Sequence, residues 1–579
     1  MPAPRFPQRT LAAVCLGSAI ITLHPGGRAQ APPAAQSPDT QRPVLRATTR
    51  LVEVNVVVHD RKGASVANLT RDEFQVYDSG VKQDVAMLRV ERVTAASAAP
   101  AEERTPPVPP LPPGTFSNLV DGQAGGTDAV TVILMDDLNT PLLDQAFAHR
   151  HLIKFLGTLK PTDRIALYAL GHDLRILHDF TDDREALLRV LRRHRIYAGP
   201  EVALGKVAAY NTENANLDAF LTGTDRFVAD AQAADRARIT LDAMTAIAAH
   251  VAGVPGRKNL VWVSGGFPFA VGEDQWPDDI RRDTRTFAGP MERAARAVAD
   301  ARLAIYPVDA HSLFTASDLT AVEPIGVNSV RPLPPTGPSE TVRQAQLMHV
   351  AMDVLAKRTG GRAFFSTADL TGAIRSAIDD ANVTYVLGYY PTHQAWNGTF
   401  RTLTVKVTRP GLNVRHRVGY VAFADEPATG EARTAALAQA ARSPVDATLI
   451  GLTLQLARDE PAAGMLRATI VIDARHLSVQ PRGTRVEAQV DMRFVMQGTA
   501  EGPPMSATRT VSFDLARDAY EEAMKTGLRV TQDVDVAQCG YRLKVVVRDA
   551  VSGRIGSVTA RPDALRPAAT TGRRPTSAP

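Results

Sequence analysis

The sequence predicts an α/β protein with a doubly wound, mainly parallel sheet at its centre and β-rich modules on either side. Three observations indicate this fold class. From about 128 to 390, apolar runs alternate with stretches of helical spacing, which is the pattern of repeated βα units. The run "AVTVILMD" (129–136) is almost continuously apolar, as expected of a strand covered on both faces. Outside this region, apolar and polar residues alternate in short segments, which is typical of antiparallel strands.

The amino terminus has the pattern of a secretory signal peptide. Arg5 and Arg9 precede an apolar run from Leu11 to Leu23, and small residues follow around Ala29. The run is shorter than a membrane-spanning helix requires, so we expect cleavage after Ala29, export to the periplasm or the medium, and no membrane span in the mature chain. Cleavage would leave Cys539 without a partner for an intrachain disulfide, and we expect it to be a buried packing thiol.

Composition favours a globular protein that does not bind nucleic acid. The chain has 579 residues, enough for two to four domains, and 44% of them are hydrophobic. The formal net charge is +5, and basic residues alternate with acidic ones along the sequence. There is no zinc-finger spacing and no arginine-rich arm, so nothing in the sequence supports a nucleic-acid partner.

Proline-rich and polar segments divide the chain into parts. In order, we expect a signal peptide (1–29), a linker (30–43), an N-terminal β module (44–95), a Pro-rich linker (96–127), the α/β domain (128–390), a β-hairpin extension (391–425), a C-terminal β-sandwich (440–566) and a disordered tail (567–579).

Local patterns predict the elements of each part. In the β module we expect a strand at 51–58, a helical turn capped by Thr70 and Glu73, and a hairpin around Asp78-Ser79-Gly80. In the α/β domain we expect strands at 129–136, 164–171, 174–180, 258–266, 302–310 and 383–390, helices at 141–158, 289–302 and 340–358, and a polar insertion at 196–226. The strand at 174–180 should be antiparallel to its neighbour, and the one at 383–390 should close the sheet. A hairpin around Pro410-Gly411 should follow (400–423).

A set of motifs in a fixed order resembles the von Willebrand factor type A family, in the branch found in secreted proteins of Acidobacteria and related soil bacteria. The motifs are "LTRDEFQVYDSG", "VILMDDLNT", "FTDDREALLRVL", "KNLVWVSGGFP", "LAKRTGGRAFFSTADL" and "YVLGYYP", and together they span about 50 to 423. The resemblance implies a Rossmann-like fold. It also implies a metal-ion-dependent adhesion site at the carboxyl ends of the strands, where Mg²⁺ binds an acidic residue of a partner.

The expected metal ligands are incompletely matched. The family pattern is Asp-x-Ser-x-Ser after the first strand, a threonine from a later loop, and an aspartate after the fourth strand. Asp136 matches the first aspartate and Thr140 the second serine, whereas Leu138 and Gly265 stand where a serine and an aspartate should be. Since Mg²⁺ prefers hard oxygen ligands, these replacements remove two of them. Candidates for the loop threonine are Thr212, Thr222 and Thr224.

Two interpretations of this edge of the sheet follow. In the first, the motif is structural: Asp136 caps backbone amides or pairs with a cation, and Asn139 and Thr140 shape the turn and start the helix. No cofactor binds in this interpretation, and Asp137, Asn139, Ser264 and Gly265 form part of a partner-binding rim. In the second, Asp136, Thr140 and Asp309 form a rebuilt Mg²⁺ site.

The preferred functional hypothesis is a secreted, non-enzymatic interaction protein. It would bind a protein or cell-surface partner through the carboxyl rim and its loops, notably 196–226 and 311–340. The alternative is Mg²⁺-dependent adhesion through the rebuilt site. A third hypothesis is an exported hydrolase using Ser264, which follows a strand. This third hypothesis is weak because Trp262 stands where a nucleophile elbow requires glycine.

Overall fold

The structure is a computed structural model of the chain. It describes residues 51–92, 111–119, 129–195, 214–266, 293–310, 340–365, 369–393, 395–422, 430–458, 464–499 and 501–561. The expected signal peptide (1–29), linker (30–43), loop 311–339 and tail (567–579) lie outside these residues. The described part is a mixed α/β protein with several sheets. Within it, every helix is either too short or too polar to cross a bilayer.

The central sheet has five strands in the order β10-β9-β6-β7-β8. They are β6 (Val130–Asp136), β7 (Arg164–Leu170), β8 (Leu174–Thr181), β9 (Lys258–Ser264) and β10 (Leu303–Asp309). β8 is antiparallel to β7, as expected, and the other pairings are parallel. From β6 the chain moves outward to β7 and β8, and then returns to β9 on the other side of β6. The direction therefore reverses between β6 and β9, and open α/β sheets bind ligands outside the carboxyl ends of the strands at such a point.

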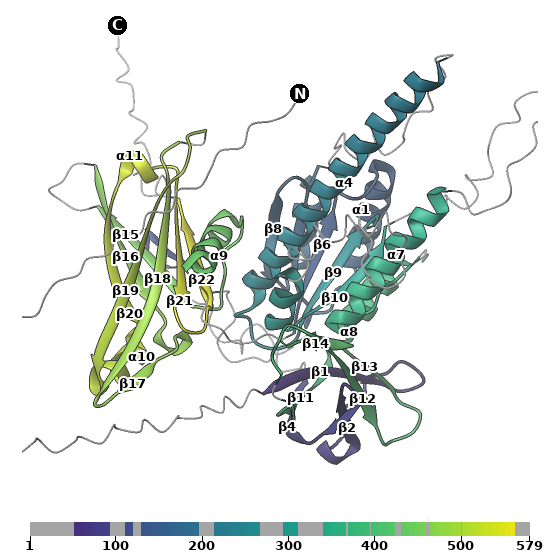
Figure 1. The fold of residues 1–579 in the computed structure, drawn as a ribbon, viewed down its shortest axis with the longest axis horizontal. Coiled ribbons are helices and arrows are strands. Elements are labelled where there is room, and N and C mark those ends of the chain that lie inside the picture. Colours follow the sequence, from purple (N-terminus) through teal and green to yellow (C-terminus); the bar gives the residue numbers. More distant parts are fainter. Residues whose placement is uncertain are drawn as a thin grey trace, which may run out of the picture. The chain divides into compact units, whose positions relative to one another are not determined.

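Helices cover both faces of this sheet, which explains why its strands are apolar along their whole length. One face carries α1 (Leu142–Leu156), α2 (Arg184–Arg193) and α8 (Leu370–Asp379), and the other carries α4 (Ala215–Val251), a helix at 293–300 and α7 (Glu340–Thr359) (Figure 1). Alternate side chains of β6 serve the two cores: Ile133 and Met135 pack under α1, and Val132 and Leu134 pack under α4. α4 begins at Ala215, so the last part of the expected polar insertion (196–226) is helical.

The β module consists of two sheets that enclose one apolar core. The first has the order β13-β1-β11-β4 and the second the order β14-β12-β2-β3. The strands are β1 (Val52–His59), β2 (Phe74–Asp78), β3 (Val81–Gln83), β4 (Val85–Arg92), β11 (Val383–Tyr389), β12 (Phe400–Val407), β13 (Asn413–His416) and β14 (Gly419–Val421). The chain thus leaves the module after β4 and returns to it at β11, on the far side of the α/β domain in sequence.

Two sequence predictions about this module are wrong. The strand at 383–390 does not close the parallel sheet, because β11 lies between β1 and β4 and is antiparallel to both. It is buried along most of its length, so it has the same apolar signature as a buried parallel strand. The segment at 400–423 is not a hairpin around Pro410-Gly411, because β12 and β13 belong to different sheets and β12 pairs with β14 and β2. The expected division into a domain at 128–390 and an extension at 391–425 therefore does not match the sheets.

Local turn predictions in the module are confirmed. The turn η1 (Arg71–Glu73) follows Thr70, whose backbone N–H donates to Oε2 of Glu73 at 2.9 Å. β2 and β3 form the hairpin, with Asp78 opposite Val81. Ser79 and Gly80 both have positive φ, at 50° and 84°, as a two-residue turn of type I′ requires.

The C-terminal part is a β-sandwich, as predicted, and its core contains Cys539. Burial raises the pKa of this thiol to about 11. One sheet has the order β20-β16-β15-β5, and the other has the order β17-β18-β21-β22, with β19 also paired to β18. The elements are β15 (Leu452–Arg458), β16 (Met465–Ile472), β17 (Gln480–Arg482), β18 (Arg485–Gln497), β19 (Met505–Ala516), β20 (Leu528–Asp535), β21 (Arg542–Asp549) and β22 (Ile555–Ala560), with helices α9 (Gly430–Arg442), α10 (Arg517–Thr526), α11 (Val536–Cys539) and η3 (Ala474–His476).

One strand of this sandwich comes from the segment expected to be a linker (96–127). β5 (Thr115–Ser117) pairs antiparallel with β15, and Phe116 packs against the sandwich core. The prediction of an unbroken linker is therefore wrong. Proline and small residues dominate the segment, and a three-residue strand is too short to produce a periodic signal.

Candidate functional site

Asp136 lies at the carboxyl end of β6, where the direction of the sheet reverses, and its carboxylate is buried. It accepts hydrogen bonds from the backbone N–H of Asn139 at 3.1 Å and from the Asn139 side-chain amide at 2.9 Å. The indole N–H of Trp262 donates to Oδ2 at 2.9 Å, and the hydroxyl of Ser264 donates to the same oxygen at 2.7 Å. The carboxylate therefore joins β6, β9 and the turn after β6.

Among the described residues, the groups that hydrogen-bond to the Asp136 carboxylate are neutral dipoles and not cations. Burial raises the pKa of Asp136 to about 6, while the hydrogen bonds from Asn139, Ser264 and Trp262 act in the opposite direction. At neutral pH the group is therefore mostly ionised, and its hydrogen-bond donors are all neutral. Burying an ionised carboxylate costs free energy unless hydrogen bonds compensate for the lost water. The donors around Asp136 supply this compensation at the point where the sheet reverses direction.

Hydrogen bonds through the Thr140 side chain join the turn after β6 to the end of β9. The hydroxyl of Thr140 donates to the backbone oxygen of Asp136 at 2.5 Å and accepts the backbone N–H of Gly265 at 2.8 Å. A Cβ atom at Gly265 would lie 2.8 Å from the backbone oxygen of Asn139 and 3.1 Å from Cα of Thr140. Position 265 therefore has no room for the aspartate that the metal-site pattern requires, unless the turn moves.

Leu138 is a core residue rather than a rim residue. Its side chain is buried in the cluster beneath α4, together with Leu134 and Trp262. The position at which the resemblance implies a ligand serine therefore contributes to packing.

Asp309 lies on the same rim, two strands from Asp136. It is paired in register with Ser264 across β9 and β10. Its Oδ2 is 3.0 Å from Nε2 of His349 on α7, and the imidazole of His349 stacks on Phe365 with 4.4 Å between ring centres. Asp309 and Asp136 thus face different partners, although both are at carboxyl ends of strands.

Asp137 points to the opposite face of the sheet, toward α1 and α2. Its Oδ2 is 2.9 Å from Nε2 of His194, and its backbone oxygen accepts from the side-chain amide of Gln145 at 2.9 Å. The remaining space beside these groups is about 10 Å³, which is room for about one water molecule. This half of the rim is therefore filled.

These donors do not suit Mg²⁺ as they are arranged. Mg²⁺ requires several oxygen ligands in near-octahedral geometry. The carboxylate of Asp136 already accepts from Asn139, Trp262 and Ser264, and the Thr140 hydroxyl is engaged by backbone groups. In the part of the chain that the structure describes, no three His, Cys, Asp or Glu side chains gather as metal ligands would.

The remaining candidates from sequence lie apart from this site or outside the described residues. Thr224 is exposed on α4, where its hydroxyl donates to the backbone oxygen of Phe220 at 2.9 Å. Thr212 lies outside the described residues, and the side chain of Thr222 is not described. Ser264 hydrogen-bonds to a carboxylate, and no described histidine contacts its hydroxyl, so the base of a hydrolytic triad is missing from the described residues.

Several residues of the site were not identified from the sequence. Thr240 on α4 accepts from the Asn139 amide at 2.9 Å, and His194, Trp262 and His349 contact the rim aspartates. Trp262 could have been suspected, because an indole inside a buried strand needs an acceptor for its N–H. Thr240 and His349 come from α4 and α7, and His194 directly follows α2. All three are distant in sequence, and nothing local indicates which end of the sheet they approach.

Two leucines beside the motif are exposed. Leu142 and Leu143 begin α1, directly after Pro141, and their relative accessible areas are 52% and 83%. They follow the closed turn on the same rim. Two adjacent exposed leucines therefore lie at the edge where open α/β sheets bind ligands.

Comparisons with known proteins give distant structural likenesses only. No family model and no curated protein matches the chain. Among solved structures, the chain is similar to an aerotolerance-related membrane protein from Bacteroides fragilis, determined with multiple mutations to serines: the identity is 12%, the TM-score is 0.22, and the match covers 43% of this chain and 98% of that one.

Two other solved structures show likenesses of the same order. For the conserved hypothetical protein BatB from Bacteroides thetaiotaomicron the identity is 12%, the TM-score is 0.17, and the match covers 31% of this chain and 66% of that one. For the PilB minor pilin from Streptococcus sanguinis the identity is 9%, the TM-score is 0.22, and the match covers 45% of this chain and 61% of that one. With TM-scores this low, the function has to be argued from the residues of this chain.

Proposed function

We propose that this chain is an exported, non-enzymatic interaction protein with a von Willebrand type A-like α/β domain, and that it binds a protein partner through the carboxyl rim of its central sheet. The strand order, with the reversal between β6 and β9, supports the choice of rim. The observation that carries the proposal is the exposure of Leu142 and Leu143 directly after the turn that contains Asn139 and Thr140.

Buried hydrogen bonds tie the turn before these leucines to the sheet, which suits a preformed binding surface. Asp136, Ser264 and Thr140 tie β6, β9 and the turn together through buried hydrogen bonds. A preformed surface loses less conformational entropy when a partner binds. Because the same bonds occupy the polar groups of Asp136 and Thr140, binding in this proposal depends on apolar contact and not on Mg²⁺.

An affinity capture from the envelope fraction of the source organism tests the proposal. The wild-type chain, the double variant Leu142→Ser/Leu143→Ser and the control Val551→Ser would each be used with Mg²⁺ and with a chelator. Val551 is an exposed aliphatic residue of the C-terminal sandwich, 52% accessible, so Val551→Ser controls for a general loss of exposed apolar surface. We expect the same partner with wild type and Val551→Ser in both conditions, and its loss with the double variant.

Other outcomes separate the alternatives. Capture that requires Mg²⁺ and disappears in Asp136→Ala would support adhesion through Asp136, Thr140 and Asp309 in place of the metal-independent rim. Equal capture by the double variant would show that the rim at Leu142 and Leu143 is not the binding surface.

A further inference from the structure

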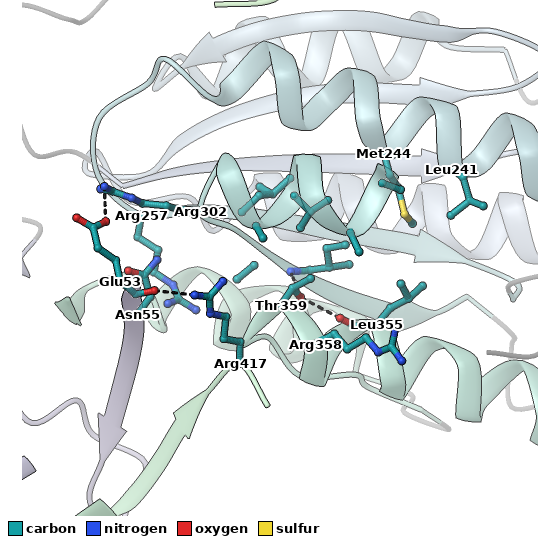
Figure 2. A pocket seen from close by; sticks show the side chains of 17 residues that line it. Glu53, Asn55, Leu241, Met244, Arg257, Arg302, Leu355, Arg358, Thr359 and Arg417 are labelled. Carbon is teal, nitrogen blue, oxygen red and sulfur yellow. Dashed lines mark hydrogen bonds and ion pairs between the residues drawn. The ribbon is translucent and has the colours of Figure 1, made fainter. Parts of the chain in front are cut away.

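A second candidate site lies at the amino-terminal end of the central sheet, opposite the carboxyl rim. It is a pocket of about 80 Å³ between the start of β10, the helices 293–300, α4 and α7, and the β module (Figure 2). This volume is room for several water molecules, whereas the gap beside Asp137 has room for about one. The pocket shares no residue with the rim, so it is independent of the proposed function.

The two ends of the pocket differ in chemistry. Figure 2 shows Leu241 and Met244 of α4 and Leu355 of α7 at one end, and the apolar side chain of Val298 also lines the pocket. At the other end, Figure 2 shows Arg257, Arg302 and Arg417 gathered beside Glu53 and Asn55 of β1. A fourth lining arginine, Arg358 of α7, lies toward Leu355 in Figure 2, and its guanidinium carbon is 5.4 Å from the centre of the Phe400 ring.

Guanidinium groups outnumber carboxylates among the residues that line this pocket. Among the lining residues Glu53 is the one acidic side chain, and it forms an ion pair with Arg302. Arg257 is buried and donates to neutral groups, the hydroxyl of Tyr306 at 2.9 Å and the side-chain oxygen of Asn259 at 3.2 Å. Arg417 donates to the backbone oxygen of Glu53 at 2.9 Å, and its buried Nε has no hydrogen-bond partner among the described residues. The pocket therefore has an excess of positive charge that a bound anion would neutralise.

Arg302 has a strained backbone conformation. Arg302 follows the helix at 293–300 with φ of 54°, in the left-handed region that glycine usually occupies at the end of a helix. A non-glycine residue there costs about 1–2 kcal/mol in the backbone alone. Its ion pair with Glu53 links the α/β domain to β1, so the strained residue lies at the charged end of the pocket.

From this geometry we infer that the pocket binds a small amphipathic carboxylate, with its carboxylate at the arginines beside Glu53 and its apolar body between Met244, Val298 and Leu355. Guanidinium groups pair with carboxylates through two parallel hydrogen bonds, which favours this head group over a neutral one. The apolar end favours a short acyl or aryl chain over a sugar or an amino acid. Glu53 competes with the ligand for the same guanidinium groups.

Calorimetric titration of the full chain with octanoate tests this inference, with 1-octanol and acetate as probes that lack the charge or the chain. We expect saturable binding of octanoate, and binding at least about tenfold weaker for each of the other two. Equal binding of 1-octanol, or no saturable binding of octanoate, would overturn the inference.

Three variants and one control locate the site. Arg302→Gln, at a guanidinium beside Glu53, should weaken octanoate binding by about tenfold, and Glu53→Gln should strengthen it by a factor of about three, because a competing carboxylate is removed. Ala295→Phe should abolish binding by filling the pocket from a half-buried position. Lys357→Gln, at the exposed neighbour of Arg358 that does not line the pocket, should bind as wild type. Binding that is unchanged in all three variants would place octanoate elsewhere and refute the assignment.

Discussion

The hydroxyl of Ser264 at the end of β9 donates a 2.7 Å hydrogen bond to Oδ2 of Asp136 at the end of β6. This bond crosses the point at which the sheet reverses direction, and both side chains are buried. The Asp136 carboxylate is therefore already engaged by hydrogen bonds within the protein. The rim is therefore expected to depend on this bond for its stability.

Ser264→Ala should destabilise the α/β domain by about 1–3 kcal/mol, because a buried carboxylate loses one of its donors. Urea unfolding followed by tryptophan fluorescence would measure the change, since Trp262 is buried beside the same oxygen. Ser512→Ala is the matched control: Ser512 is exposed on β19 and should change the free energy of unfolding by less than about 0.5 kcal/mol. Equal stability of the two variants would mean that the Ser264 bond contributes little.

The pKa of Asp136 predicts an unusual dependence of stability on pH. Burial raises this pKa to about 6 in the folded chain, above its value of about 3.9 in an unfolded chain. Between these values the folded state holds a proton that the unfolded state has lost. The contribution of Asp136 to stability is therefore complete below pH of about 4 and is lost as the pH rises through about 6, by roughly 3 kcal/mol in total.

Comparison with Asp136→Asn isolates this contribution, because Asn does not titrate and has nearly the same shape. The difference in unfolding free energy between wild type and Asp136→Asn should shift in favour of the variant as the pH rises from about 4 to about 7. Denaturant unfolding at a series of pH values would measure it. A difference that is constant over this range would show that the pKa of Asp136 is not raised.

Gly265→Ala tests whether the rim can accept the side chain that the metal pattern requires. The added Cβ would lie 2.8 Å from the backbone oxygen of Asn139, so either the turn moves or the end of β9 shifts. We expect a loss of about 1–3 kcal/mol, measured by the melting temperature of the α/β domain. Gly430→Ala is the control, since an added Cβ there meets nothing within 4 Å. A Gly265→Ala variant as stable as wild type would indicate that the turn can move at little cost in free energy. Gly265→Asp would then be a way to test for a Mg²⁺ site.

The central sheet could be predicted because its evidence is local. A strand such as β6 is buried on both faces, so its apolar run is continuous, and the polar residues that follow mark its end. The placement of Asp136 at that end required no further information. β11 has the same signature for a different reason: it is covered within the β module, and its pairing with β1 and β4 depends on residues about 300 positions away.

The contacts of the site could not be predicted because they join distant segments. Trp262 is 126 positions from Asp136, and Thr240 is 101 positions from Asn139. A sequence shows that a buried indole or hydroxyl needs a partner, but not which one it finds. For the same reason, the metal pattern located this turn at the end of β6 but did not show what the turn does. Leu138 and Gly265 lack the oxygen atoms that a metal site needs. In the structure, Leu138 packs in the core and Gly265 lies against the backbone of Asn139.

Asn118 tests the finding that a strand from the expected linker belongs to the C-terminal sandwich. Its side-chain amide donates to the backbone oxygens of Ala447 at 2.7 Å and Ile450 at 2.8 Å, and its side-chain oxygen accepts the N–H of Leu452 at 2.7 Å. Asn118→Ala would leave these buried backbone groups without partners, at a cost of about 2–4 kcal/mol. The loss should appear as faster hydrogen exchange in β15, where β5 pairs, and much less in β6.

Asn413→Ala, at an exposed asparagine of β13, should leave exchange in β15 unchanged. Unchanged protection of β15 in Asn118→Ala would show that the segment at 115–118 is only loosely attached to the sandwich.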